Sequence, residues 1–261
     1  MVIKDIDDRK MPLVEHLVEL RRRLMYSLVA MAIAFVGCYI VSEQIYDFLV
    51  RPLAALYEGE PNRRLIYTAL HEAFFTYLKL SFFGALAIAF PIIAGQIYAF
   101  AAPGLYRKEK TAFLPFLIAT PILFIAGAAL VYYVIFPLAW SFFLSFERAG
   151  SEEALAIQLE AKVNEYLSLV IKLMFAFGLS FQLPVAITLL ARAGLVSSTT
   201  LKAKRKYAIV ITFLVAAFLT PPDLISQIGL GIPILVLYEI SIIAAKMVEK
   251  KRAQREEAES V

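Results

Sequence analysis

Cysteine and histidine are scarce in this sequence. The 261 residues include one cysteine, Cys38, and two histidines, His16 and His71. A single cysteine excludes an intrachain disulfide and a zinc site built on several thiolates. The sequence also lacks an HExxH motif and a glycine-rich phosphate-binding loop, so metalloprotease and nucleotide-hydrolysing chemistry are excluded. The sequence therefore predicts no metal site and no organic cofactor, and it does not favour an enzyme.

Charged residues are scarce as well. They make up 18% of the chain, against 61% apolar and aromatic residues, and the mean hydropathy is +0.72. Soluble domains carry about 25% charged and about 45–50% apolar residues. These values predict an all-α protein that crosses a membrane several times. In such a protein a net charge of +4 points to basic cytoplasmic loops and not to a nucleic-acid partner.

Long runs without charge mark the membrane spans, because a charge at the bilayer centre costs at least ~2.5 kcal/mol. The runs predict six transmembrane helices at about residues 24–42, 74–102, 112–134, 166–191, 207–221 and 225–245. The third run, residues 111–146, is too long for one helix, so its last part, 136–146, is expected to lie along the membrane surface. Residues 1–261 are thus one membrane domain that ends in a charged tail, 246–261.

The basic residues predict the orientation. Nineteen lysines and arginines fall before the first span, in the second and fourth loops, or in the tail, and five fall in the alternate loops. Cytoplasmic segments are enriched in both residues. We therefore expect a multi-pass protein of the cell's inner membrane with both termini in the cytoplasm.

Prolines and short runs predict the shape. Five prolines lie within the apolar stretches: Pro91, Pro115, Pro121, Pro184 and Pro233. Each removes a helical hydrogen bond, so kinked helices that form a concave wall are expected. The fifth and sixth runs, 207–222 and 224–238, would reach about 24 and 22 Å, less than the ~30 Å hydrocarbon core, so the lipid is expected to be thinner beside them.

A few polar residues allow both a functional and a structural interpretation. Gln182 lies at membrane depth, where it either contacts a partner or bonds a neighbouring helix of the same chain. Glu239 could pair with Lys246 or Arg192. Glu19 could pair with an arginine one turn later on its own helix, and Glu109 could be a solvated loop acid.

Four ordered motifs resemble the TatC family, the multi-spanning core of the twin-arginine protein translocase. They are EHLVELRRRL at 15–24, AFAAPGLYRKE at 99–109, FGLSFQLP at 177–184 and TPPDLISQ at 220–227. The resemblance extends over nearly the whole chain. It implies a receptor at the cytoplasmic face for twin-arginine signal peptides of folded proteins.

The resemblance also assigns roles to residues. It implies that Glu19 and Glu109, with Arg21 and Phe100 nearby, bind the signal peptide. A carboxylate suits this role because a guanidinium group pairs with it through two parallel hydrogen bonds, which lysine cannot reproduce. The resemblance also marks the turn formed by Pro221, Pro222 and Asp223, where Asp223 is expected to cap the last helix.

The resemblance implies partners too. These are TatA and TatB type single-span subunits, oligomeric receptor complexes and a supply of energy from the proton gradient. Many family members have glutamate at the position of Gln182. Glutamine does not titrate, so this residue is not expected to carry a proton. Its side-chain amide can still form a hydrogen bond with a partner helix, and that role is expected. The alternative function is an ion-coupled transporter of small solutes, which the absence of an inverted repeat and the few intramembrane charges disfavour.

Overall fold

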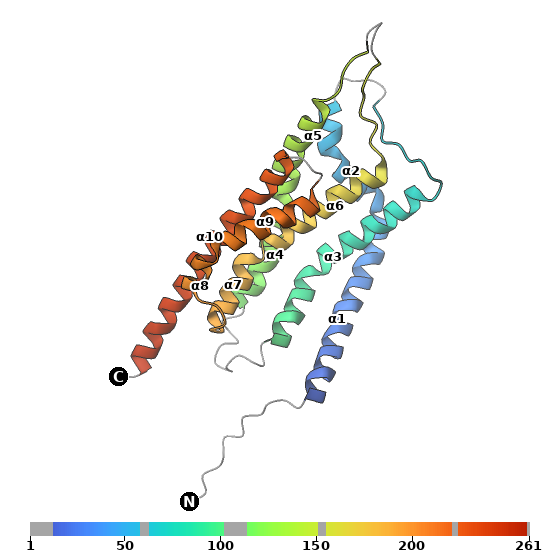
Figure 1. The fold of residues 1–261 in the computed structure, drawn as a ribbon. Coiled ribbons are helices and arrows are strands. Elements are labelled where there is room, and N and C mark those ends of the chain that lie inside the picture. The colour runs from blue at the N-terminus through green and yellow to red at the C-terminus, as the bar shows by residue number, and fades with distance from the viewer. Residues whose placement is uncertain (1–12, 58–62, 102–113, 151–154, 221–223, 260–261) are drawn as a thin grey trace, which may run out of the picture.

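The structure, a computed structural model, describes residues 13–57, 63–101, 114–150, 155–220 and 224–259. Most of these residues form helices, and α1 begins at the same end of the molecule at which α10 ends (Figure 1). We call this the termini end and the opposite one the distal end. The elements are α1 (Leu13–Ile40), α2 (Ser42–Ala54), the 3-10 turn η1 (Ala55–Tyr57), α3 (Glu72–Ala101), α4 (Leu114–Leu130), the π-helical turn η4 (Val131–Ile135), α5 (Phe136–Leu144), α6 (Val163–Ser180), α7 (Leu183–Arg192), α8 (Ser198–Ala203), α9 (Arg205–Leu219) and α10 (Leu224–Glu259).

Several helical segments are long and apolar enough to cross a membrane. In the described part of the chain there are five: Val14–Ile40, Glu72–Phe100, Pro115–Leu144, Val163–Arg192 and Gln227–Gln254. The apolar helix α9 has 15 residues, which reach about 22 Å. The all-helical, multi-span fold class is confirmed, and the sixth span stays a prediction that rests on α9.

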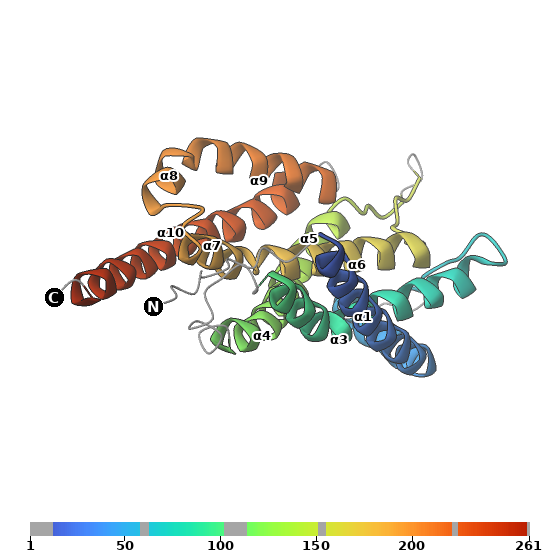
Figure 2. The ribbon, with the colours of Figure 1, turned by 90° about the horizontal axis from the view of Figure 1, so that it is seen from below.

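The helices stand side by side in an open row, as the view from the termini end shows (Figure 2). α1 packs mainly on α3, α3 and α4 pack on α6, and α10 contacts both α7 and α9. Only 6% of the apolar window of α1 is buried, so this helix is attached by one narrow face. The wall-like arrangement therefore has α1 at one edge and α9 at the other.

The third span differs from its prediction. The chain does not leave the helix near residue 134, because α4 continues through η4 into α5 as one apolar segment, Pro115–Leu144. Pro137 has no amide hydrogen to give to the carbonyl of Tyr133, and the wider π-helical turn η4 absorbs this gap. Phe136 and Trp140 are buried in the core. The expected helix end near residue 134 was wrong, and the position of 136–146 relative to the membrane surface stays a prediction.

The last helix was also underestimated. α10 has 36 residues and includes most of the segment that was expected to be a charged tail. Its apolar part extends beyond Glu239, whose charge is paired with Arg205 at the start of α9 (Nη2 to Oε2, 2.6 Å), a partner that the sequence did not suggest. The expected pair of short spans is therefore one short helix, α9, beside one long helix, α10.

Four of the five prolines lie inside helices or at the junction of two helices, where bends are expected. Pro91, Pro121 and Pro233 lie inside α3, α4 and α10, and Pro184 lies where α6 gives way to α7. Pro115 is the second residue of α4, where the amide it lacks would have had no helical partner. Pro115 therefore starts a helix and does not bend one.

The main core lies toward the distal end. It joins α2, η4, α5 and α6 through large side chains that are fully or almost fully buried, among them Leu53, Phe136, Trp140, Leu167 and Phe177. Phe136 stacks on Trp140 with ring centroids 5.4 Å apart, and Trp140 lies 5.4 Å from the Tyr166 ring. Aromatic packing of this kind fixes the helices relative to one another.

Hydrogen bonds between distant parts of the chain fasten the distal end. Arg63 and Glu147 form two parallel bonds of 2.6 Å, and the Leu159 amide donates to the same carboxylate (2.7 Å). The hydroxyl groups of Tyr132 and Tyr166 donate to carbonyls of α2, at 2.7 and 3.0 Å. This end is therefore a closed frame from which the helices run toward the termini end.

Candidate functional site

The first half of the candidate site is a pair of side chains on α1. Glu19 and Arg23 are four residues apart and therefore lie on one helix face. Arg23 donates from Nε to Glu19 Oε1 (2.9 Å), and its Nη2 also bonds this oxygen. Both side chains are largely buried, with 14% of Glu19 and 19% of Arg23 exposed. Arg22, the other possible partner, is exposed.

The second half comes from α3, which packs along α1. Gln96 Oε1 lies 3.5 Å from Arg23 Nη1, and the ring of Phe100 stacks on His16 with centroids 4.3 Å apart. These contacts place the last two turns of α3 against the first three turns of α1. Phe100 therefore lies one helical turn from Glu19, as part of the same surface.

Glu19 retains an unused acceptor. Its Oε2 atom is buried and has no hydrogen-bond partner, whereas Oε1 is bonded to Arg23. A buried carboxylate oxygen without a donor is unfavourable, so the geometry suits a further donor that arrives from outside. A guanidinium group is such a donor, since it offers five N–H groups in a planar fork.

The other expected residues of this site are placed differently. Arg21 is exposed on α1, on the opposite side of the helix from the Glu19–Arg23 pair, and among the described residues no hydrogen bond or ion pair joins it to them. Glu109 lies outside the described residues, as do Pro221, Pro222 and Asp223. The predicted roles of these residues therefore stay predictions.

A second polar cluster lies where α6 gives way to α7. Pro184 has no amide hydrogen, and the Gln182 amide bonds the Leu179 carbonyl in a tightened turn (2.9 Å). The freed Gln182 side chain donates from Nε2 to the carbonyl of Thr120 on α4 (3.0 Å). The Thr120 hydroxyl lies 2.9 Å from the Tyr98 hydroxyl of α3. The cluster thus connects three helices.

Gln182 also retains an unused atom. The side chain as a whole is half-buried, but its Oε1 is buried and has no hydrogen-bond partner. The amide nitrogen is used within the chain, and the oxygen is the atom that a further donor could reach. Of the two interpretations that the sequence left open, the structure shows the bond to a neighbouring helix of the same chain, and the contact with a partner stays a prediction.

Glycine lets α4 and α6 approach closely enough to build this cluster. A Cβ atom at Gly127 would lie 2.7 Å from the Phe177 carbonyl oxygen, and one at Gly178 would lie 2.6 Å from the Phe124 ring. No larger residue fits without a shift of the backbone or of the ring. The close approach of α4 and α6 at these two glycines brings the Thr120 carbonyl within hydrogen-bond distance of the Gln182 side chain.

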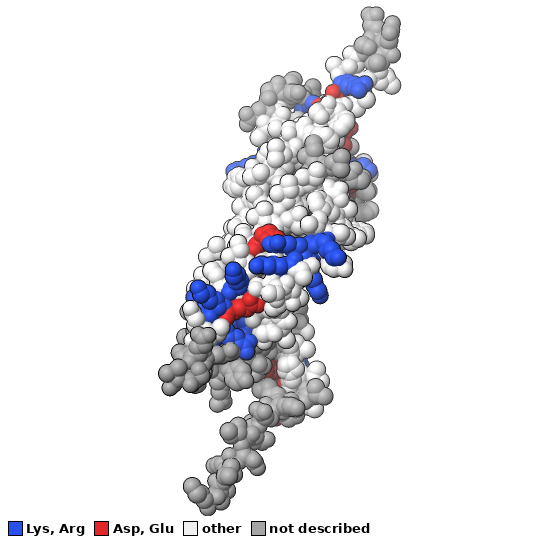
Figure 3. Space-filling model, turned by 60° about the vertical axis from the view of Figure 1, so that its left-hand side comes forward, with Lys and Arg blue, Asp and Glu red and all other residues white. Residues whose placement is uncertain are grey.

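Basic side chains gather on one face of the termini end (Figure 3). They come from α8, the residue that links α8 to α9, the start of α9 and the last part of α10. The exposed ones are Lys202, Lys204, Arg205, Lys206, Lys246, Lys250, Lys251 and Arg252. Glu249 of α10 accepts from the amide and the hydroxyl of Ser198, at 2.7 and 2.5 Å, and so holds the start of α8. The sequence prediction of a charged tail missed this structural contact.

Several site residues escaped the sequence analysis. Arg23 was considered only as a surface partner of Glu19, and His16 and Gln96 were given no role at the site. The i, i+4 spacing predicted the Glu19–Arg23 pair, but no sequence signal fixes how α1 and α3 align. The described residues hold no cluster of His, Cys, Asp and Glu able to bind a metal.

Comparison with known proteins identifies the family. Residues 15–233 match the family model described as Sec-independent protein translocase protein (TatC). The TatC protein of Magnetococcus marinus is 51% identical over 97% of this chain and 90% of its own length, and that of Escherichia coli is 37% identical over 94% and 92%.

Solved structures give the same answer. A crystal structure described as the twin-arginine translocase receptor TatC matches with a TM-score of 0.76 and 35% identity, over 90% of this chain and 99% of that one. A second one, of the receptor in the detergent DDM, matches with a TM-score of 0.77 and 36% identity, over 88% and 99%. The chain belongs to the TatC family of protein translocase components.

Proposed function

We propose that this protein is the receptor and assembly core of the twin-arginine translocase, and that it binds twin-arginine signal peptides of folded proteins at the termini end. The observation that carries the proposal is the buried, unpaired Oε2 of Glu19 beside a carboxylate oxygen already bonded to Arg23. One guanidinium of the signal peptide completes the hydrogen bonds of Glu19, and Glu109 binds the other. Phe100 packs against the peptide, and Arg21 borders the site.

Crosslinking of a signal peptide tests this assignment. Glu19→Ala removes the acceptor and is expected to weaken binding about 10- to 100-fold, because a charge-assisted hydrogen bond is lost. Glu15→Ala is the matched control, since Glu15 is an exposed acid one turn earlier on the same helix. Glu109→Ala is expected to behave as Glu19→Ala does.

A peptide with two lysines in place of the two arginines gives the second arm. It should bind the wild-type protein weakly, because lysine cannot form the two parallel bonds. Normal crosslinking of both Glu19→Ala and Glu109→Ala, with the protein present in the membrane at wild-type level, would refute the proposed site.

The proposal places the termini end in the cytoplasm and the protein in the cell's inner membrane. The concentration of exposed basic residues at this end supports that orientation. The sole cysteine, Cys38, is 2% exposed, so a thiol probe added to intact cells reports introduced cysteines. Leu155→Cys, at the distal end, should react from outside, and Thr199→Cys should not. The reverse pattern would contradict both the orientation and the receptor role.

Partners of the TatA and TatB type are proposed to dock on the wall of helices, with Gln182 as one contact and oligomeric receptor complexes as the assembly. The unpaired Oε1 of Gln182 supports this, because it can accept a hydrogen bond from a single-span helix. The proton gradient is proposed to supply the energy. The family role in protein transport is not enzymatic, and it does not favour the alternative of a small-solute transporter.

A further inference from the structure

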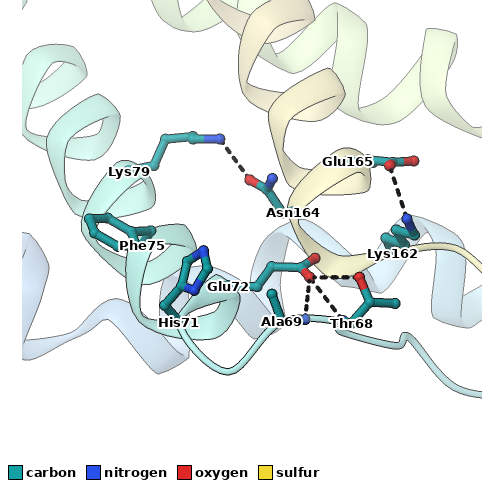
Figure 4. Close-up of a pocket in the computed structure, with 9 residues that line it drawn as sticks. All are labelled: Thr68, Ala69, His71, Glu72, Phe75, Lys79, Lys162, Asn164 and Glu165. Atoms are coloured by element: carbon teal, nitrogen blue, oxygen red, sulfur yellow. Dashed lines mark hydrogen bonds and ion pairs between the residues drawn. The ribbon is translucent and has the colours of Figure 1, made fainter.

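A cavity of about 500 Å³ lies at the distal end, where α3 and α6 begin (Figure 4). This volume falls within the range of about 300–1,000 Å³ that small-molecule sites occupy. Its walls carry charges of both signs: Lys79 and Lys162 are cationic, and Glu72 and Glu165 are anionic. None of these four residues has a part in the proposed signal-peptide site, which lies at the other end of the molecule.

Lys79 is a cation whose hydrogen-bond partners are neutral. Its half-buried ammonium donates to Asn164 Oδ1 (2.7 Å) and Ser168 Oγ (2.9 Å), which are both neutral. Among the described residues no carboxylate lies within ion-pair distance of it. An ammonium has three N–H donors, and a partly buried charge is stabilised by an opposite charge. The third donor of Lys79 thus suits an anionic oxygen in the cavity.

The two carboxylates on the same walls select the kind of anion. The Glu72 carboxylate accepts from the Thr68 amide (2.9 Å), and Glu165 forms only a long contact with Lys162, 3.7 Å, with 72% of its side chain exposed. A ligand with negative charge alone would be repelled by both carboxylates, because they line the same cavity. A ligand that carries an amine next to its anionic group would satisfy both ends of the cavity.

The position of the cavity points to a lipid. Lys79 lies seven residues after the start of α3, about 10 Å along a helix that is long and apolar enough to span the membrane. Phe74 and Phe75 of the same turn are 54% and 55% exposed, so an apolar surface borders the polar cavity. This combination matches the region where headgroups meet acyl chains.

We propose that this cavity binds the zwitterionic headgroup of a phosphoethanolamine lipid. The phosphate accepts from Lys79, and the primary amine donates to Glu72 and Glu165. A choline headgroup binds less well because its quaternary nitrogen has no N–H to donate, and a glycerol headgroup binds less well because it brings no positive charge to the carboxylates.

Native mass spectrometry of the full-length purified protein tests the proposal. The protein is equilibrated with phosphatidylethanolamine, phosphatidylcholine and phosphatidylglycerol of identical acyl chains, one at a time and in competition. We expect phosphatidylethanolamine to be retained in preference to the other two. Lys79→Met should weaken its binding about 10-fold or more. Lys172→Met is the matched control, because Lys172 is an exposed lysine of α6 outside the cavity.

Glu165→Gln separates the two ends of the headgroup and changes an exposed residue, so it also serves if Lys79→Met does not fold. It should weaken phosphatidylethanolamine binding and leave phosphatidylglycerol binding unchanged or stronger. Equal retention of all three lipids by the wild-type protein would overturn the proposal. So would equal losses in Lys79→Met and Lys172→Met, or equally strong competition by soluble glycerophosphoethanolamine, which would assign the cavity to a free solute.

Discussion

The two ends of the molecule are built in different ways. At the distal end, side chains bond partners 84 to 117 residues away in sequence, as in Arg63–Glu147 and Tyr166 to the Leu49 carbonyl. At the termini end the strongest charged pair of α1, Glu19–Arg23, is local, and α1 is attached to α3 by one face. The contacts of α1 with α3 at this end are the long approach of Arg23 to Gln96, 3.5 Å, and the stacking of His16 on Phe100, and among the described residues no ion pair joins the two helices. We therefore expect α1 and α3 to separate here more easily than the segments of the distal end.

This difference suits a receptor. The distal frame holds the spans at fixed positions. Among the described residues the buried acceptors without partners, Glu19 Oε2 and Gln182 Oε1, lie nearer the termini end, whereas the buried donor without a partner, Trp140 Nε1, lies in the distal core. Unpaired polar atoms weaken a fold but are available to a ligand. Stability and binding are therefore expected to depend on different ends of the protein, and the following variants test that separation.

The largest effect is expected for Phe136→Ala. Phe136 is fully buried in the distal core, and truncation of such a ring costs about 3 kcal/mol or more. Phe100→Ala is the matched variant at the termini end, where the ring is only half-buried against His16. In SDS unfolding titrations of the reconstituted protein Phe136→Ala should be far less stable than Phe100→Ala. Signal-peptide crosslinking should show the opposite order among folded molecules.

The next effect concerns the Arg63–Glu147 pair. A double-mutant cycle with Arg63→Gln and Glu147→Gln should give a coupling of about 2 kcal/mol, because two charge-assisted bonds are lost. Hydrogen bonds from Arg63, helped by the Leu159 amide, hold the pKa of Glu147 below its usual 4.5. The pair's stabilisation is therefore complete above pH 4.5 and is lost as the pH falls through the lowered pKa. Melting temperatures recorded between pH 3 and 7 should therefore fall more steeply on acidification in the wild-type protein than in Glu147→Gln.

Sequence patterns predicted the five helical segments that are long and apolar enough to cross a membrane, but they did not predict how far the helices continue. Charge-free runs located the membrane helices, since lipid tolerates few charges. The helix α2 was missed because its charges hid an apolar face that is visible at Ile45, Leu49 and Leu53, four residues apart. The helix through η4 was missed because a π-helical turn absorbs Pro137, and no local pattern distinguishes that outcome from a helix end.

The candidate site was predictable only in part, because local sequence patterns do not determine how separate helices align. The spacing of Glu19 and Arg23 predicts their pairing, because helix geometry is periodic. The contacts of α3 with α1, through Gln96 and Phe100, depend on how two helices align over 73 residues of intervening chain. The distal cavity was missed because Lys79, Asn164 and Ser168 meet across two helices, and the sequence presents Lys79 only as an isolated lysine near a span end.

A smaller effect is expected for Gln182→Leu. The change keeps the side-chain volume roughly constant but removes the bond to the Thr120 carbonyl and the unpaired oxygen. Interhelical hydrogen bonds in membranes contribute about 0.6 to 2 kcal/mol. We expect a modest loss of stability and weaker crosslinking to a single-span partner, with signal-peptide binding retained. Unchanged partner crosslinking would remove Gln182 from the proposed docking surface.

The smallest effect is expected for Arg205–Glu239, which makes the comparison between the two ends quantitative. This pair and Arg63–Glu147 both have a 2.6 Å bond between arginine and glutamate, so their chemistry is matched. They differ in exposure: 49% and 48% of the Arg205 and Glu239 side chains are exposed, against 12% and 20% for Arg63 and Glu147. Exposed ion pairs contribute about 0 to 1 kcal/mol because water and salt screen them. A double-mutant cycle with Arg205→Gln and Glu239→Gln should therefore give a coupling energy below that of the distal pair, and high salt should reduce it further.

A coupling energy at Arg205–Glu239 as large as that at Arg63–Glu147 would mean that the termini end is held together as firmly as the distal frame. The proposed division between a fixed end and a binding end would then be wrong.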